Sequence, residues 1–156
     1  MKNLPHHLAA LLTTAWVGGL WAIGYLAAPV LFSTQPDKQL AGLLAGQMFT
    51  WMSYAGMVCG AYLLWYHWRI ADHFPARKKI IVIIASMLII TLILQCGVQP
   101  MMAALKVQAL PLDVMQSALS SRFKAMHGIS QILYLMQSLL GIFLLIKTSR
   151  TRLASK

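Results

Sequence analysis

The residues best suited to chemistry in this sequence are polar side chains that interrupt long apolar segments. Three of these segments place amides or hydroxyls at a similar distance, roughly 10 to 17 Å at ~1.5 Å per residue, from the same charged boundary. These residues are Gln47, Gln95, Gln99, Ser130, Gln131 and Tyr134, and His127 lies on the same helical face as the last three, about one turn inside Lys124. Because such groups face hydrocarbon only at a cost, we expect them to converge inside a helix bundle and form a pocket for a small ligand or a partner helix.

His127 is the only ionisable side chain in this set, and ionisable groups inside membrane segments are functional suspects. It could hold a ligand, carry a proton or contact a cofactor. The alternative, which the position near the boundary favours, is a structural residue that hydrogen-bonds a neighbouring glutamine. No Asp or Glu lies in any apolar segment and no motif specifies a reaction, so the sequence favours a non-enzymatic protein.

Two alternatives involve metals or transport. His7 and His67 lie toward the opposite boundary, where a histidine pair could ligate the iron of haem b. The ten methionines offer soft ligands for copper. We predict no dedicated metal site, because no cysteine or carboxylate completes a recognisable ligand spacing. Transport of a metal or small molecule is the other alternative, and it requires an oligomer because the segments lack acidic residues along a cation path.

The elements that must position these residues are four apolar stretches without Asp, Glu, Lys or Arg: residues 7–33, 40–68, 80–105 and 125–146. Each is long enough to cross the ~30 Å hydrocarbon core of a bilayer at ~1.5 Å per residue. The chain is 59% hydrophobic and 10% charged, whereas globular domains are about 25% charged. We therefore predict an all-α membrane protein: one domain, residues 1–156, forming a four-transmembrane-helix bundle in the lipid bilayer.

The basic residues set the expected orientation. Nine of the 13 Lys and Arg lie at the amino terminus, in the second connection and in the tail. Because cytoplasmic loops carry this excess, both termini are predicted to lie on the cytoplasmic side of a bacterial inner membrane. These residues flank apolar segments instead of lining one helix face beside aromatic residues, so binding of nucleic acid is not predicted. From Pro111 onward apolar residues recur at helical spacing, which predicts an early start of the fourth helix or an interfacial helix before it.

Small residues at a spacing of four mark the second segment. Gly42 and Gly46 form one such pair, and Gly56 and Gly60 form another. In lipid, such pairs let helix backbones approach closely. They predict tight packing within the chain, and the alternative is that this face contacts a second copy or another protein of a membrane complex.

An ordered set of motifs resembles a known family. The motifs are Trp16-Val-Gly-Gly-Leu-Trp21, Tyr25-Leu-Ala-Ala-Pro29-Val-Leu-Phe32, Ala41-Gly42-xxx-Gly46-xx-Phe49 and Phe123-xxx-His127-xx-Ser130. The pattern resembles bacterial domain-of-unknown-function proteins grouped with the transmembrane protein 205-like family. This resemblance implies a four-helix inner-membrane protein without an established activity. His7 followed by Trp16-Val-Gly-Gly-Leu is also similar to the first helix of copper resistance D-type and membrane protoporphyrinogen oxidase-type proteins.

Overall fold

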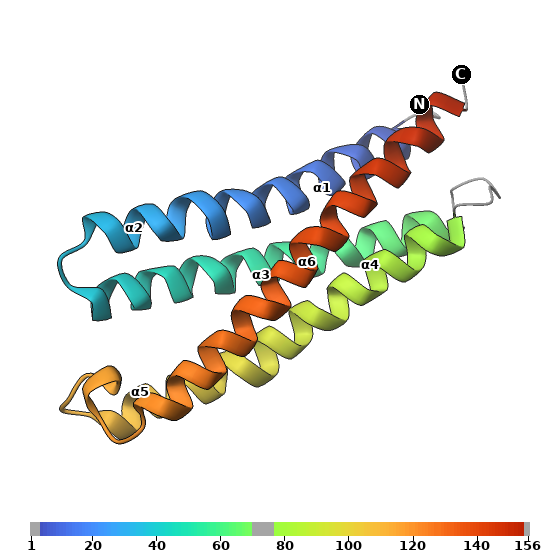
Figure 1. Cartoon of the computed structure of the whole chain (residues 1–156). Coiled ribbons are helices and arrows are strands. Elements are labelled where there is room, and N and C mark those ends of the chain that lie inside the picture. The colour runs from blue at the N-terminus through green and yellow to red at the C-terminus, as the bar shows by residue number, and fades with distance from the viewer. Residues whose placement is uncertain (1–3, 70–76, 155–156) are drawn as a thin grey trace.

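The computed structural model describes residues 4–69 and 77–154 of the chain, and within these ranges the regular structure is entirely helical. Four long helices follow one another, two of them interrupted by a π-helical turn (Figure 1). Their segments are α1 (Leu4–Trp21), η1 (Ala22–Ala27), α2 (Ala28–Thr34), α3 (Lys38–Arg69), α4 (Arg77–Leu92), η2 (Ile93–Val98), α5 (Gln99–Ala109), the 3₁₀ turn η3 (Val114–Gln116) and α6 (Ser120–Ala154).

Three of the four helices are long and apolar enough to cross a membrane, namely residues 4–34, 77–109 and 120–149. The fourth, α3, has 32 residues, which corresponds to about 48 Å of helix. Its two glutamines and its tryptophan and tyrosine rings lower its mean hydropathy, although it covers the whole of the predicted segment 40–68. The structure is therefore that of a helical protein with the apolar helices expected of a membrane protein.

The four helices form a closed ring of neighbours. Helix α1 packs against α3 and α6, and α4 packs against the same two helices from the opposite side. Helix α1 begins and α6 ends at one end of the bundle, which we call the terminal end. The 35–37 and 110–119 connections lie at the other end, which we call the loop end (Figure 1). Helix α6 crosses the others at an angle in this view, so the part of α6 that its neighbours cover changes along its length.

Close packing around Trp16 holds α1, α3 and α4 together. The Trp16 indole is 1% exposed. A Cβ atom added at Gly56 would lie 2.5 Å from its Nε1 atom, and one added at Gly60 would lie 2.5 Å from Cδ2 of Leu88 on α4. The Gly56 and Gly60 pair thus serves packing inside the bundle. By contrast, an added Cβ would meet nothing within 4 Å at Gly46.

Each π-helical turn ends two residues before a proline. Pro29 is the second residue of α2, and Pro100 is the second residue of α5. Proline has no backbone N–H and its ring clashes with the carbonyl four residues earlier, so the helix must widen or break just before it. In this chain it widens into η1 and η2. Irregular turns of this kind occur often at functional positions.

The connection before α6, residues 110–119, contains one capped turn. The Asp113 carboxylate accepts a hydrogen bond from the backbone N–H of Met115, at 2.7 Å, and starts the three-residue turn η3. Val114 of this turn is buried. The helical spacing that begins at Pro111 is therefore realised as one 3₁₀ turn, followed by α6 from Ser120.

Candidate functional site

A chain of buried hydrogen bonds joins α6 to α4 in the middle of the bundle. The side-chain amide of Gln137, which is 2% exposed, donates to Oγ1 of Thr91 at 2.8 Å. The Thr91 hydroxyl donates in turn to the Met87 carbonyl at 2.9 Å. Each donor in this chain finds an acceptor, which is what buried polar groups in an apolar span require.

Tyr134 makes a second connection, from α6 to the first helix. Its hydroxyl donates to the carbonyl of Leu20 at 2.5 Å, and it lies close to Gly24, where an added Cβ atom would be 2.9 Å from it. Leu20 and Gly24 are four residues apart, the spacing of one α-helical hydrogen bond. The Tyr134 hydroxyl therefore lies where the α-helical pattern gives way to the π-helical turn η1.

Gly24 makes this approach feasible because it has no side chain. A Cβ atom added there would lie 2.3 Å from Cε1 of Tyr134. The Tyr134 ring also meets Phe49 and Tyr25 edge to face, with centroids 5.2 and 6.3 Å away. Three helices thus converge on one tyrosine at the widened turn.

Two further buried oxygens on the same two long helices have no hydrogen-bond partner within residues 4–69 and 77–154. They are Oε1 of Gln95, in η2, and Oγ of Ser138, which follows Gln137 on α6. We call Thr91, Gln95, Tyr134, Gln137 and Ser138 the polar seam. It consists of amides, hydroxyls and a phenol, which donate and accept hydrogen bonds but provide neither a carboxylate nor an imidazole for proton transfer at neutral pH.

His127 lies outside the seam, on an exposed part of α6 nearer the loop end. Its Nε2 atom is 3.2 Å from the side-chain nitrogen of Gln131, which is also exposed. The imidazole stacks on Phe123, with ring centroids 6.2 Å apart. Ser130 donates to the His127 carbonyl at 2.7 Å. His127, Ser130 and Gln131 therefore form a local cluster on one helix.

The other predicted residues lie apart from this cluster. Gln47 is exposed on α3, and Gln99 is partly buried at the start of α5. In the part of the chain that the structure describes, no hydrogen bond joins either of them to His127, Gln131 or Tyr134. Of the seven predicted residues, Gln95 and Tyr134 thus belong to the polar seam and His127, Ser130 and Gln131 form the cluster on α6, while no hydrogen bond among the described residues connects Gln47 or Gln99 with either group.

The histidines at the terminal end differ in burial: His67 is buried, whereas His6 and His7 are exposed. His67 is 6% exposed, and its Nδ1 atom has no partner among the described residues. His7 is exposed on α1. The histidine that contacts the same region is His6, whose Nδ1 atom is 3.1 Å from the hydroxyl of Tyr66. No group of three His, Cys, Asp or Glu within the described ranges could hold a metal ion.

Thr91 and Gln137 were not singled out from the sequence. A signal for Gln137 was present, since it follows Tyr134 by three residues and Ser130 by seven and so lies on the same helical face. Thr91 gave no such signal, because an isolated threonine in an apolar helix usually bonds its own backbone.

Comparison with known proteins gives one match. The model of a family described as a domain of unknown function (DUF4149) matches residues 11–111, which is more than half of the 156-residue chain. The matched region runs from α1 through α5 and ends before α6. No curated protein and no solved structure matches the chain.

Proposed function

The chain belongs to this family of a domain of unknown function, and we propose that it is a bacterial inner-membrane protein whose four helices all cross the bilayer. The length of α3 and its contacts with α1 and α4 support a fourth crossing, because a helix inside this ring shares the depth of its neighbours. The excess of Lys and Arg at the terminal end supports a cytoplasmic location for both termini. The resemblance to the transmembrane protein 205-like family agrees with the same arrangement.

We further propose that the protein has no catalytic activity and that the loop half of α6 binds a membrane-spanning helix of a partner. The main observation that supports this proposal is the hydrogen-bonded pair of His127 and Gln131 on an exposed part of α6. At ~1.5 Å per residue, His127 lies roughly 5 Å and Gln131 roughly 10 Å beyond Lys124, the last charged residue before the apolar segment 125–146. Polar groups at that depth gain free energy when another helix covers them and completes their hydrogen bonds.

The polar seam supports a structural role for the interior rather than a reaction. Gln137, Thr91 and Tyr134 are already hydrogen-bonded to other helices or to backbone carbonyls. Their bonds connect α6 with α4 and with α1. A rigid interior of this kind presents the exposed part of α6 to a partner in one orientation.

Site-specific photocrosslinking in native membranes tests the partner helix. A benzoylphenylalanine probe placed at Gln131 is expected to yield a crosslinked product, while one at Met136 is not. Met136 is the matched control because it is exposed on the same helix, roughly 140° around its axis. An adduct of twice the 17.3 kDa chain mass would identify a second copy as the partner. Equal crosslinking at both positions, or none at either, would refute the proposal.

One observation favours a second candidate, a haem or copper protein. The buried His67 imidazole has a ring nitrogen without a partner among the described residues, and His6 and His7 lie at the same end of the bundle. An absorption spectrum and a metal analysis of protein purified in mild detergent test it. A Soret band or stoichiometric copper would support this candidate, and a colourless, metal-free sample would exclude it.

A further inference from the structure

A stripe of exposed residues runs along the outer face of α3. Its positions are separated alternately by four and three residues, so they repeat every 3.5 residues on average. The stripe, which we call the α3 stripe, consists of Leu40, Leu44, Gln47, Trp51, Tyr54, Val58, Ala61, Trp65 and Trp68. It extends over about 42 Å at ~1.5 Å per residue, which is most of the length of the helix.

The period of the α3 stripe differs from the 3.6 residues per turn of a straight α-helix. A period of 3.5 residues is that of a helix which winds around another helix in a left-handed pair. The contacts of α3 inside the bundle use the opposite face, where Gly56 lies against Trp16 and Gly60 lies against Leu88. The α3 stripe is therefore arranged to contact a helix outside the bundle.

The middle of the α3 stripe carries polar groups at a depth where lipid offers no hydrogen bonds. Trp51 and Tyr54 lie near the midpoint of α3, with ring centroids 6.0 Å apart and side chains 69% and 46% exposed. Tryptophan and tyrosine usually gather at the two interfaces of a membrane instead. Among the described residues, no hydrogen bond uses the Trp51 indole, the Tyr54 hydroxyl or the Gln47 amide. Contact with another helix would supply these bonds.

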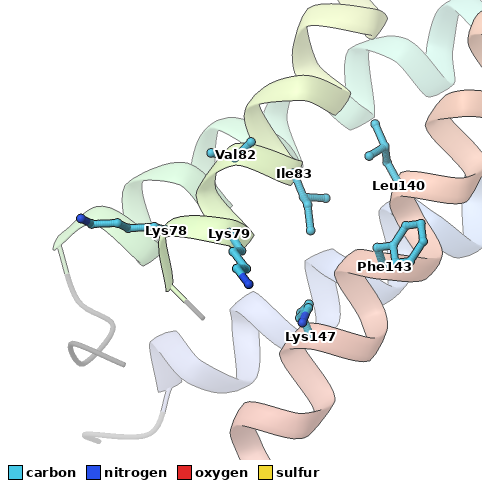
Figure 2. Close-up of a pocket in the computed structure, with 7 residues that line it drawn as sticks. All are labelled: Lys78, Lys79, Val82, Ile83, Leu140, Phe143 and Lys147. Carbon is cyan, nitrogen blue, oxygen red and sulfur yellow. The ribbon is translucent and has the colours of Figure 1, made fainter. Parts of the chain in front are cut away.

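The surface between α4 and α6 has a different character. A pocket of about 350 Å³ there is lined by apolar side chains such as Val82, Ile83 and Phe143, with Lys79 and Lys147 toward the terminal end (Figure 2). Apolar side chains with charge confined to the helix ends are typical of a surface that contacts lipid. The α3 stripe departs from this pattern, because its polar groups lie in the middle of the helix.

The chemistry of the α3 stripe fits a second copy of the same chain. A side-chain amide donates and accepts hydrogen bonds, so the Gln47 amide is satisfied by an identical amide. A two-fold axis along the membrane normal brings residues of equal depth in two copies side by side, and Gln47 then meets the same residue of the second copy. A single polar residue at such a position also fixes the register of two paired helices.

The exposed area of the α3 stripe is sufficient for a stable dimer. Its four aromatic side chains are 46% to 69% exposed, which at roughly 150 to 250 Å² for a whole side chain leaves about 350 to 600 Å² uncovered. Its leucines and its valine, 39% to 70% exposed, add further apolar area. The total is close to the roughly 800 Å² that each partner contributes to an interface of standard size.

We propose that the protein forms a parallel homodimer in the membrane through the α3 stripe, with the Gln47 amides of the two copies hydrogen-bonded to each other. This inference rests on the proposed crossing of the bilayer by α3. The α3 stripe is separate from the partner surface proposed on α6, because α3 and α6 lie diagonally across the ring of helices. A two-fold interface closes on itself and leaves α6 of each copy accessible to its partner.

Disulfide crosslinking in native membranes tests the dimer. In a Cys59→Ala/Cys96→Ala background, a single cysteine is introduced by Val58→Cys or by Ala61→Cys. Oxidation with copper phenanthroline is expected to link two copies at either position, because each lies on the α3 stripe and meets its own counterpart across the two-fold axis. The product is expected to have twice the 17.3 kDa chain mass.

The matched control is Ile89→Cys in the same background, and it is expected to give no crosslinked product. Ile89 is 57% exposed on α4. Its neighbour Leu88 packs against Gly60, so Ile89 lies at nearly the same depth as Val58. The two positions therefore differ in the helix that carries them and agree in exposure and depth.

Analytical ultracentrifugation of the full chain in mild detergent measures the dissociation constant of the dimer. Trp51→Ala is expected to weaken dimerisation about 30-fold, the loss typical of a tryptophan at the centre of an interface. Gln47→Leu is expected to weaken it about 3-fold, the loss of one hydrogen bond between membrane helices. Ile89→Ala, the matched control on α4, is expected to leave the dissociation constant unchanged.

Equal crosslinking at Val58 and Ile89 would overturn the proposal, as would the absence of any product at both positions of the α3 stripe. A product of another mass at Val58 would assign the stripe to a different protein and overturn the assignment to a second copy. A failed dimer would leave the photocrosslinking result at Gln131 unaffected, since that probe reports on α6. The two proposals can therefore fail independently.

Discussion

Substituting Gly24 with alanine is the sharpest perturbation of the packing between the first and last helices. The new Cβ atom would lie 2.3 Å from Cε1 and 2.9 Å from the hydroxyl oxygen of Tyr134. Tyr134 cannot stay in place at such distances, so its ring must move away from the widened turn η1. That movement also breaks the hydrogen bond from its hydroxyl to the carbonyl of Leu20.

Opposing effects determine how much Gly24→Ala changes the free energy of unfolding. Glycine to alanine within a helix stabilises by roughly 0.5 to 1 kcal/mol when nothing obstructs the methyl group. Overpacking costs about 1 to 3 kcal/mol, and the lost hydrogen bond costs roughly 0.6 kcal/mol in a membrane protein. The expected net loss for Gly24→Ala is therefore about 1 to 3 kcal/mol. Gly18→Ala, in the same helix, is expected to gain stability, since an added Cβ there meets nothing within 4 Å.

The assay is reversible unfolding in mixed micelles, monitored by the circular dichroism of the helices. It is applied to the single variants and to a double-mutant cycle that combines Gly24→Ala with Tyr134→Ala. In a Tyr134→Ala background the obstruction is gone, so Gly24→Ala should behave like Gly18→Ala and stabilise the protein. The reasoning would be refuted if Gly24→Ala destabilised the protein equally in both backgrounds. It would also be refuted if Gly24→Ala and Gly18→Ala had the same effect on the unmodified chain.

Other predictions concern the seam, the core and the exposed pair. Gln137→Leu is expected to lower the free energy of unfolding by less than about 2 kcal/mol, because the Thr91 hydroxyl keeps its bond to a backbone carbonyl. A larger loss would indicate that the Gln137 amide makes stabilising interactions beyond its hydrogen bond to Thr91. Gly56→Ala should destabilise by about 1 to 3 kcal/mol in the same assay, since the added methyl meets a buried indole, and an unchanged midpoint would contradict this packing. His127→Leu combined with Gln131→Leu should abolish crosslinking from a probe at a neighbouring position while leaving monomer stability unchanged, and loss of stability would place the pair in the fold instead.

The sequence predicted the helical segments closely because hydrophobicity is a local property. The predicted segment 40–68 corresponds to α3, Lys38–Arg69, and the predicted segment 125–146 lies within α6. In both cases the helix continues beyond the apolar run into charged residues, since backbone hydrogen bonding does not stop where the apolar residues stop. Composition alone does not mark such ends.

The candidate site was predicted less completely. Tyr134 and His127 share a helical face about 100° wide, yet Tyr134 reaches the backbone of the first helix while His127 is exposed. Periodicity assumes that one face of a helix is buried along its whole length. Because α6 crosses its neighbours at an angle, the covered face changes from one turn to the next (Figure 1).

By itself, the sequence determined that the chain consists of apolar helices, where they lie along the chain and which end carries the basic residues, because each of these follows from residue type and local spacing. The tertiary structure decided which polar groups meet. The Tyr134 hydroxyl bonds a carbonyl 114 residues earlier in the chain, and Lys79 and Lys147 share one pocket although they lie on different helices. The physical reason is that such contacts depend on how whole helices are rotated and how they cross. The packing of Trp16 against glycine and the widened turns before the prolines determine this arrangement.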